Sequence, residues 1–130
     1  KFNFPELSLA TVKREYCLDL GKVRNIARVK LNGKDLGVIW TSPWQVDVSN
    51  ILKEKNNILE IEIANLWVNR LIGDEWLLDD GIKNGTWPDW LLEGAPRPSS
   101  RYTFTTYRYY KKEGELQESG LLGPVCILAK

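Results

Sequence analysis

The sequence predicts an all-β protein, built as an antiparallel β-sandwich of the jelly-roll type. Three observations lead to this prediction. Apolar and charged residues alternate over 26–31, which is the period of a half-buried strand. Asn32-Gly33 follows at once, and this pair is the strongest short-range signal for a hairpin turn. Roughly six to eight strand candidates are spread along the chain with few helical patterns, which is typical of sandwiches.

The expected elements follow one another along the chain. Leu59, Ile61 and Ile63 alternate with glutamates and make the clearest strand after the hairpin. Pro43 interrupts the strand pattern, because proline has no N–H to give to a ladder. In order, we expect a strand at 11–20, a turn at 21–25, the hairpin at 26–40, a strand at 45–48, a helical turn at 49–52, a polar turn at 54–57, a strand at 58–66, a strand at 101–110, a polar loop at 111–119 and a closing strand at 125–129.

Size and charge limit the function classes. A chain of 130 residues suits one domain, so we expect a single sandwich over 1–130. The net charge is +1 and the basic residues are scattered, which gives no electrostatic footprint for nucleic acid or an anionic membrane. No apolar run approaches the length needed to cross a bilayer. We therefore expect neither a nucleic-acid partner nor a membrane partner.

The counts of histidine, methionine and cysteine exclude several kinds of catalytic and metal site. The chain has no histidine, which excludes Ser-His-Asp catalysis, Cys-His catalysis and histidine-ligated zinc. It has no methionine and begins with Lys1, so we expect it to be a piece of a longer protein. Cys17 and Cys126 lie near opposite ends, and sandwiches often pair their first and last strands. A disulfide and two free thiols both remain open, and free thiols are favoured for a domain of this size.

Residues 67–100 interrupt the strand pattern with a long stretch of no clean period. A connection of this length is usually functional or disordered. The stretch is acid-rich and holds four of the six tryptophans, and disorder would leave that much aromatic surface wet. We therefore expect an ordered, irregular excursion from the sandwich.

The excursion offers the chemistry of a carbohydrate site. An indole stacks on the apolar face of a sugar ring, while amide, guanidinium and carboxylate groups pair with the hydroxyls. We predict carbohydrate contacts from Trp67, Asn69, Arg70, Asp74, Glu75, Trp87, Trp90 and Arg97. The alternative is structural. Burial is the usual fate of tryptophan, and Arg97 and Arg101 would then clamp acidic loop residues in bidentate fashion.

The sequence holds no motif for dinucleotide, P-loop, zinc-protease or EF-hand chemistry. Two carboxylate pairs, Asp74-Glu75 and Asp79-Asp80, invite a glycosidase reading, which needs carboxyl groups roughly 5–10 Å apart. We assign no catalytic residue and interpret these acids as solvated side chains or as partners of Arg70 and Arg97. A calcium ion held by loop oxygens is a further alternative; no other cofactor is indicated.

Several stretches resemble known carbohydrate-active enzymes. VKLNGKDLG (29–37) and SPWQVDV (42–48) look like the sugar-binding β-sandwich of glycoside hydrolase family 2 and its relatives. NLWVNRLIGDE (65–75), RYTFTT (101–106) and SGLLGPV (119–125) resemble the C-terminal sandwich of bacterial family 106-type hydrolases, the α-L-rhamnosidase-like group. The lead-in at 1–9 looks shorter than in that group, and the insert at 76–96 looks longer.

The resemblance implies a galactose-binding-like jelly roll that serves as a non-catalytic accessory module of a secreted or periplasmic bacterial polysaccharide-degrading enzyme. Its implied partners are a carbohydrate, from a plant or host polysaccharide, and the catalytic domain of the same polypeptide, where the catalytic carboxylates would lie. Three functions stay open at this point: a carbohydrate-binding module, a structural module packed on the catalytic domain, and a small hydrolase that uses the loop carboxylates.

Overall fold

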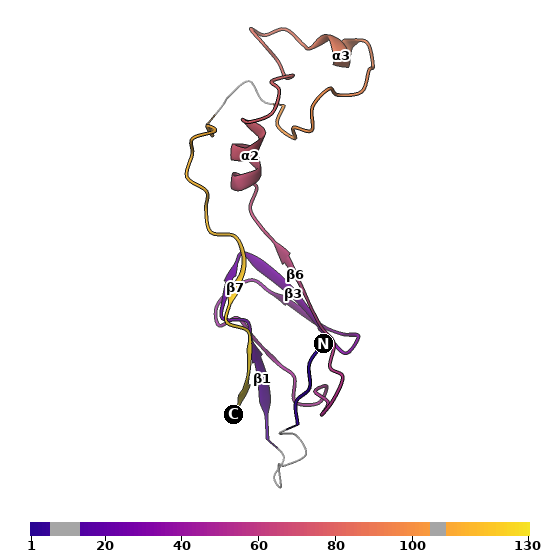
Figure 1. Ribbon diagram of the computed structural model, residues 1–130, viewed down its shortest axis with the longest axis vertical. Coiled ribbons are helices and arrows are strands. Elements are labelled where there is room, and N and C mark those ends of the chain that lie inside the picture. Colours follow the sequence, from indigo (N-terminus) through magenta and orange to yellow (C-terminus); the bar gives the residue numbers. More distant parts are fainter. Residues whose placement is uncertain (6–13, 105–108) are drawn as a thin grey trace. The chain divides into compact units, whose positions relative to one another are not determined.

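The structure is a computed structural model that describes residues 1–5, 14–104 and 109–130 (Figure 1). The chain divides into two compact units. Unit 1 comprises Lys1–Asn65 and Glu118–Lys130, and unit 2 comprises Leu66–Gln117. Unit 2 takes in the expected excursion at 67–100 and continues beyond it. Among the described residues, unit 1 contains all the strands and unit 2 both short helices.

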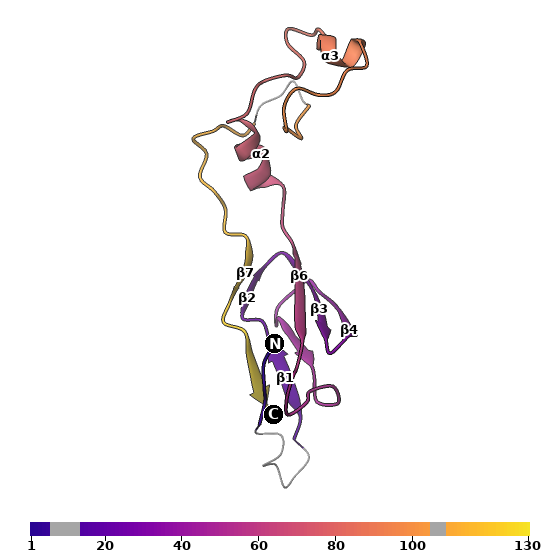
Figure 2. The same cartoon turned by 45° about the vertical axis from the view of Figure 1, so that its right-hand side comes forward.

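Unit 1 is an all-β antiparallel sandwich, as the sequence predicts. Its strands form three sheets with the orders β5-β1-β8, β2-β7 and β4-β3-β6, and every pairing between these strands is antiparallel. Figure 2 shows β2 beside β7, two strands that are far apart in sequence. The strands are β1 (Tyr16–Asp19), β2 (Lys22–Arg24), β3 (Ile26–Leu31), β4 (Lys34–Ile39), β5 (Gln45–Asp47), β6 (Leu59–Ala64), β7 (Gly120–Gly123) and β8 (Cys126–Ala129).

The β3–β4 hairpin confirms the clearest sequence signal. Asn32 and Gly33 have φ values of 53° and 82°, the left-handed conformation that a tight two-residue hairpin turn requires. The Asn32 side chain also fastens the turn, because its Nδ2 donates to the carbonyl of Ile51 at 2.8 Å and its Oδ1 accepts the N–H of Ile58 at 2.9 Å. Asn32 therefore serves both the backbone of the turn and its attachment to the next loop.

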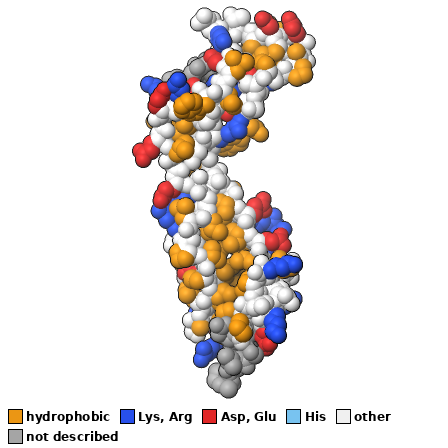
Figure 3. Space-filling view, in the orientation of Figure 1, with side chains coloured by type: hydrophobic (Ala, Val, Ile, Leu, Met, Phe, Trp, Pro, Cys, Tyr) orange, Lys and Arg blue, Asp and Glu red, His pale blue; other side chains and the backbone are white. Residues whose placement is uncertain are grey.

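The core lies against the central strand β3. Val29 and Ala27 are fully buried, and they face Leu20 and Val48, which are also fully buried and belong to the same cluster. On β6, the inward row of Leu59, Ile61 and Ile63 is half-buried while the alternate residues are exposed, as predicted. Hydrophobic side chains consequently reach the surface over the strands of unit 1 (Figure 3). No helix among the described residues has the length and apolar character needed to span a bilayer.

Three expectations about the strands were wrong. The predicted turn at 21–25 contains the short strand β2, and β7 was not predicted because glycines, which strands disfavour, occupy both of its ends. Residues 101–104 were expected to open a strand but form none. The backbone N–H groups of Tyr102 and Thr103 bond the buried carboxylate of Asp74 instead of a ladder. The rest of the predicted strand at 101–110 includes 105–108, which lie outside the described residues, as do 11–13.

The first and last of these strands, β1 and β8, pair as expected of a sandwich. Cys17 lies opposite Leu128 and Cys126 lies opposite Asp19, so the two cysteines are two residues out of step. Both are free thiols, Cys17 buried and Cys126 exposed, which confirms the favoured alternative.

Candidate functional site

Unit 2 begins with the seven-residue helix α2 (Val68–Asp74), which directly follows Trp67. An i,i+4 ion pair runs along it, with Arg70 Nε 3.0 Å from Asp74 Oδ1. Asp74 is fully buried at the end of the helix. A helix this short spans only two turns, which explains why no clean period appears in the sequence.

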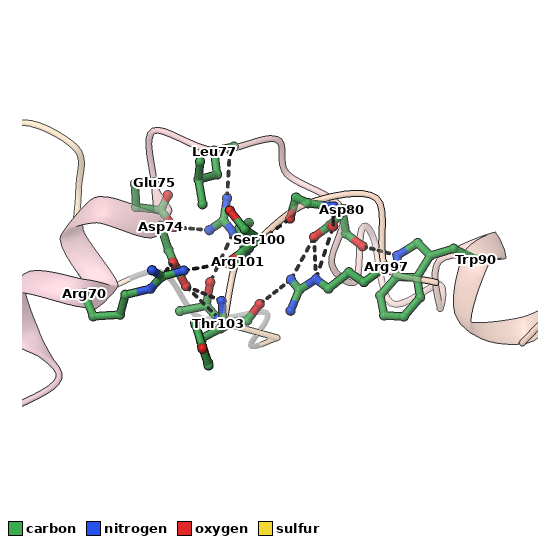
Figure 4. A network of polar contacts seen from close by, with 12 residues as sticks. Arg70, Asp74, Glu75, Leu77, Asp80, Trp90, Arg97, Ser100, Arg101 and Thr103 are labelled. Atoms are coloured by element: carbon green, nitrogen blue, oxygen red, sulfur yellow. Dashed lines mark hydrogen bonds and ion pairs between the residues drawn. The ribbon is translucent and has the colours of Figure 1, made fainter. Parts of the chain in front are cut away.

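Asp74 anchors the segment that returns toward unit 1 (Figure 4). Its Oδ2 accepts the backbone N–H groups of Tyr102 at 2.8 Å and Thr103 at 2.7 Å. Burial raises the pKa of this carboxyl group, but those hydrogen bonds and the charge of Arg70 outweigh it, and the pKa falls below its ordinary value of 3.8. Asp74 is therefore ionised and acts as an internal fastening for the loop.

A second ion pair reinforces the same contact. Arg101, whose side chain is 5% exposed, pairs with Glu75 and donates to the hydroxyl of Thr103 at 3.1 Å. Arg70 donates to the carbonyl of Ser100 as well. The segment 100–103 is thus held to the end of α2 by charged groups rather than by strand pairing.

Asp80 is the centre of a third set of charged contacts, after those of Asp74 and of Arg101 with Glu75. Arg97 approaches it in bidentate fashion, with Nε 3.1 Å from both carboxylate oxygens and a terminal nitrogen 2.7 Å from Oδ1. The N–H of Ser99 donates to Oδ2 at 3.0 Å. The guanidinium group and Ser99 outweigh burial and hold the pKa of Asp80 far below its usual range. Both arginines pair with acidic loop residues as predicted, and the bidentate geometry is found for Arg97.

These carboxylates make unit 2 acid-sensitive. Asp74 and Asp80 have folded-state pKa values below 3.8, so they bind protons less readily in the folded chain than in the unfolded chain. The two carboxylates contribute their full stabilisation of unit 2 when the pH is above the pKa they have in the unfolded chain. This stabilisation is lost as the pH falls through the lower pKa values they have in the folded chain. We expect the urea midpoint of unit 2 to be level from about pH 7 to 5 and to drop between about pH 4 and 2.

Tryptophan fluorescence reports this transition, because unit 2 holds four of the six tryptophans. Asp80→Asn removes one titrating group and is expected to flatten the acid limb in part. A midpoint that is the same at pH 2 and pH 7 would contradict the assignment.

The aromatic rings of unit 2 lie largely at its surface. Trp67, Trp76 and Trp87 are 58%, 70% and 51% exposed, so the burial expected of tryptophan under the structural alternative does not apply to these three. Each is nevertheless held in place. Trp67 packs on Tyr102 with ring centroids 5.4 Å apart, and Trp87 stacks on Phe104 at 5.7 Å. Figure 3 shows hydrophobic side chains reaching the surface among charged groups around α2 and α3 (Asp89–Leu92).

The structure separates the predicted carbohydrate-contact residues into two groups. Trp67 and Trp87 are exposed, and Trp90 is half-buried with its indole N–H donated to the carbonyl of Asp80 at 2.7 Å. The polar members bond within unit 2. Asn69 exchanges two hydrogen bonds of 2.8 Å with the backbone of Gln117. The others, Arg70, Asp74, Glu75 and Arg97, form the ion pairs described above.

Sequence reasoning missed two surface residues beside these rings, Tyr102 and Lys112. The guanidinium carbon of Arg70 lies 4.4 Å from the ring centroid of Tyr102, which is 66% exposed. Lys112 Nζ lies 5.7 Å from the ring centroid of Trp76. Both come from segments that return to α2 from far along the chain, so no local pattern in the sequence announces them.

The acidic residues do not form a metal cluster among the described residues: no group of three or more histidine, cysteine, aspartate or glutamate side chains is placed to hold an ion. Three of the loop acids, Asp74, Glu75 and Asp80, are instead engaged by arginines. A glycosidase general acid needs a raised pKa, whereas the pKa values of Asp74 and Asp80 are lowered. These two groups are therefore unsuited to that role.

Comparison with known proteins relates the chain to large glycosidases. No family model matches it. A curated protein of Formosa agariphila with the provisional name beta-glucuronidase is 52% identical over 114 residues, covering 85% of this chain and 10% of that protein. A solved rhamnosidase from Novosphingobium sp. PP1Y is 34% identical, with a TM-score of 0.64, over 93% of this chain and 10% of that one. The chain thus spans about a tenth of each larger protein it matches.

Proposed function

We propose that this chain is a non-catalytic accessory module of a larger, secreted bacterial glycoside hydrolase, and that unit 2 contacts carbohydrate through its exposed aromatic rings. The observation that carries this proposal is that Trp67, Trp76 and Trp87 are both exposed to solvent and held in place. Each indole is more than half exposed, yet each is fixed by a neighbouring ring or by a hydrogen bond. Rigid, exposed indoles lose little conformational freedom when a ligand covers them.

The comparisons support the first part of the proposal. Both proteins carry glycosidase names, and both are about ten times longer than the matched stretch. The catalytic carboxylates would then lie elsewhere on the polypeptide. One of these proteins is named a glucuronidase and the other a rhamnosidase, so similarity to them does not indicate which bond the larger protein would cleave.

The internal ion pairs support the second part. Because Arg97, Asp80 and Asp74 are committed to each other or to the backbone, they hold the loop that presents the rings. A single indole offers one apolar face to a sugar ring, so one such contact gives a weak site. Several indoles along one sugar chain would add their contributions, and binding should favour oligosaccharides over monosaccharides.

Titration of the 130-residue chain with oligosaccharides tests the proposal. We expect heat of binding with rhamnose-containing or other plant and host cell-surface oligosaccharides, and a loss of about fivefold in affinity for Trp67→Ala or Trp87→Ala, which corresponds to about 1 kcal/mol. Trp40→Ala is the matched control, since Trp40 is 73% exposed but belongs to unit 1. An absence of binding at millimolar ligand, or equal losses for all three variants, would contradict it.

Packing on the catalytic domain of the same polypeptide is a second candidate, favoured by the leucines of unit 2. Leu78 and Leu92 are 64% and 68% exposed, and aliphatic surface suits a protein partner better than a sugar. If this role dominates, Leu92→Ser should lower the thermal stability of the full-length enzyme while leaving the isolated chain unchanged. A full-length enzyme that keeps its stability and activity after deletion of the module would exclude it.

A further inference from the structure

Trp76 is the most exposed indole of unit 2, and it is also rigidly attached. It follows α2 after one residue, Glu75, and its backbone N–H donates to the carbonyl of Gly73 at 3.1 Å. Its indole N–H donates to the carbonyl of Lys112 at 3.1 Å. The ring is therefore fixed at both its backbone and its outer edge, while 70% of the residue stays open to solvent.

The turn that carries Lys112 is equally well placed. The N–H of Gly114 closes it by donating to the carbonyl of Lys111 at 2.9 Å. A Cβ added at Gly114 would lie 3.5 Å from the Ile72 side chain of α2, so the turn packs directly on the helix. The same helix thus positions the indole and the lysine, and Lys112 Nζ lies 5.7 Å from the centre of the Trp76 ring.

Lys112 is paired with a carboxylate less closely than the two arginines that lie over rings in unit 2. Arg97 and Arg70 lie over rings but bind the buried carboxylates of Asp80 and Asp74 at 2.7 and 3.0 Å. The carboxylate of Glu113 lies 3.8 Å from Lys112 Nζ, and both side chains are more than half exposed. Such a long surface pair contributes little, so an incoming anion can replace it at small cost.

We infer that Trp76 and Lys112 form a subsite for an anionic sugar unit, one that bears a carboxylate or a sulfate group. This inference rests on the proposed carbohydrate contact of unit 2 and adds its charge preference. The sugar ring stacks on the part of the indole that stays open to solvent, and its charged substituent meets the ammonium group that lies over the ring. A neutral sugar gains the stacking contact alone, so the subsite selects acidic chains from neutral ones.

Binding of the 130-residue chain to three oligosaccharides of equal length tests the inference: an oligogalacturonate, a sulfated galactan fragment and a neutral xylo-oligosaccharide. We expect Lys112→Gln to weaken binding of the anionic probes about twofold to fivefold at low ionic strength, and to leave the neutral probe unchanged. Near 0.5 M salt the effect of Lys112→Gln on the anionic probes should vanish, because the Debye length there is about half its physiological value and the ammonium charge is screened. Trp76→Ala should weaken binding of all probes that bind.

Lys83→Gln is the matched control, because Lys83 is an exposed lysine of unit 2 that lies outside this turn. A preference for the carboxylated or for the sulfated probe supports the inference and identifies the anion. Equal affinity for neutral and anionic probes, with Lys112→Gln silent, overturns it while the proposed function stands. Failure of these three probes and of the rhamnose-containing oligosaccharides used above overturns both.

Discussion

Replacement of Asp80 by asparagine is expected to lower the free energy of unfolding of unit 2 by about 3–5 kcal/mol, the cost of breaking a buried ion pair from one side. The Asp80 side chain is 3% exposed and that of Arg97 is 20% exposed. Asparagine keeps the volume but removes the charge, and its amide nitrogen would face donors from Arg97 or Ser99. The guanidinium group would then remain without its counter-charge inside the loop.

Urea unfolding followed by tryptophan fluorescence measures this loss, and amide hydrogen exchange assigns it to residues 66–117. Glu93→Gln is the control, because it removes one negative charge at an exposed position of the same unit. Its effect should stay within about 0.5 kcal/mol. If Asp80→Asn behaves like Glu93→Gln, the clamp does not hold the loop, and the rings are positioned by other contacts.

Gly21→Ala is expected to destabilise unit 1 by about 2–5 kcal/mol, from left-handed strain and from overpacking together. Gly21 has φ +65° and lies against the last residue of β7, Gly123, and the residue that follows it, Pro124. A Cβ there would be 2.5 Å from the carbonyl oxygen of Gly123 and 2.6 Å from that of Pro124. Both neighbours are backbone atoms, so relief requires one chain segment to move away from the other.

Gly33→Ala separates the two causes. Gly33 also has a left-handed φ, of +82°, but a Cβ there meets nothing within 4 Å. It should cost only the conformational strain, about 1–2 kcal/mol. Thermal unfolding of both variants gives the comparison, and equal losses would show that the close approach at Gly21 carries no energetic weight.

The sequence predicts the fold well where the signal is local. Asn32-Gly33 needs only its own backbone preferences to mark the hairpin, and Ile61 and Ile63 mark β6 by alternation over six residues. β7 escapes prediction because its pairing with β2 joins residues about a hundred positions apart. Its GLLG sequence has no alternation of apolar and polar residues, so its place in the sheet rests on the pairing with β2.

The arrangement of unit 2 is predicted only in part, because sequence signals are local and many of its contacts join residues far apart in the chain. Aromatic and charged residue types in 67–100 indicate an ordered excursion, and the ion pairs of its arginines follow from their chemistry. Which groups face outward depends on partners that are distant in sequence. Asp74 is buried because Tyr102 and Thr103 return to it, and Trp76 meets Lys112 across 36 positions. No spacing rule within the excursion encodes these encounters.

The anchoring of unit 2 has a consequence for how such modules diversify. Its chain leaves unit 1 after Asn65 and re-enters at Glu118, and within unit 1 the Asn65 side chain accepts the N–H of Gly120 at 2.7 Å. The two attachment points are thus tied together at the sandwich. The entropic cost of closing a loop grows only slowly with its length. The segment between these two points can therefore become longer, become shorter or be replaced while the β-sandwich of unit 1 keeps its structure.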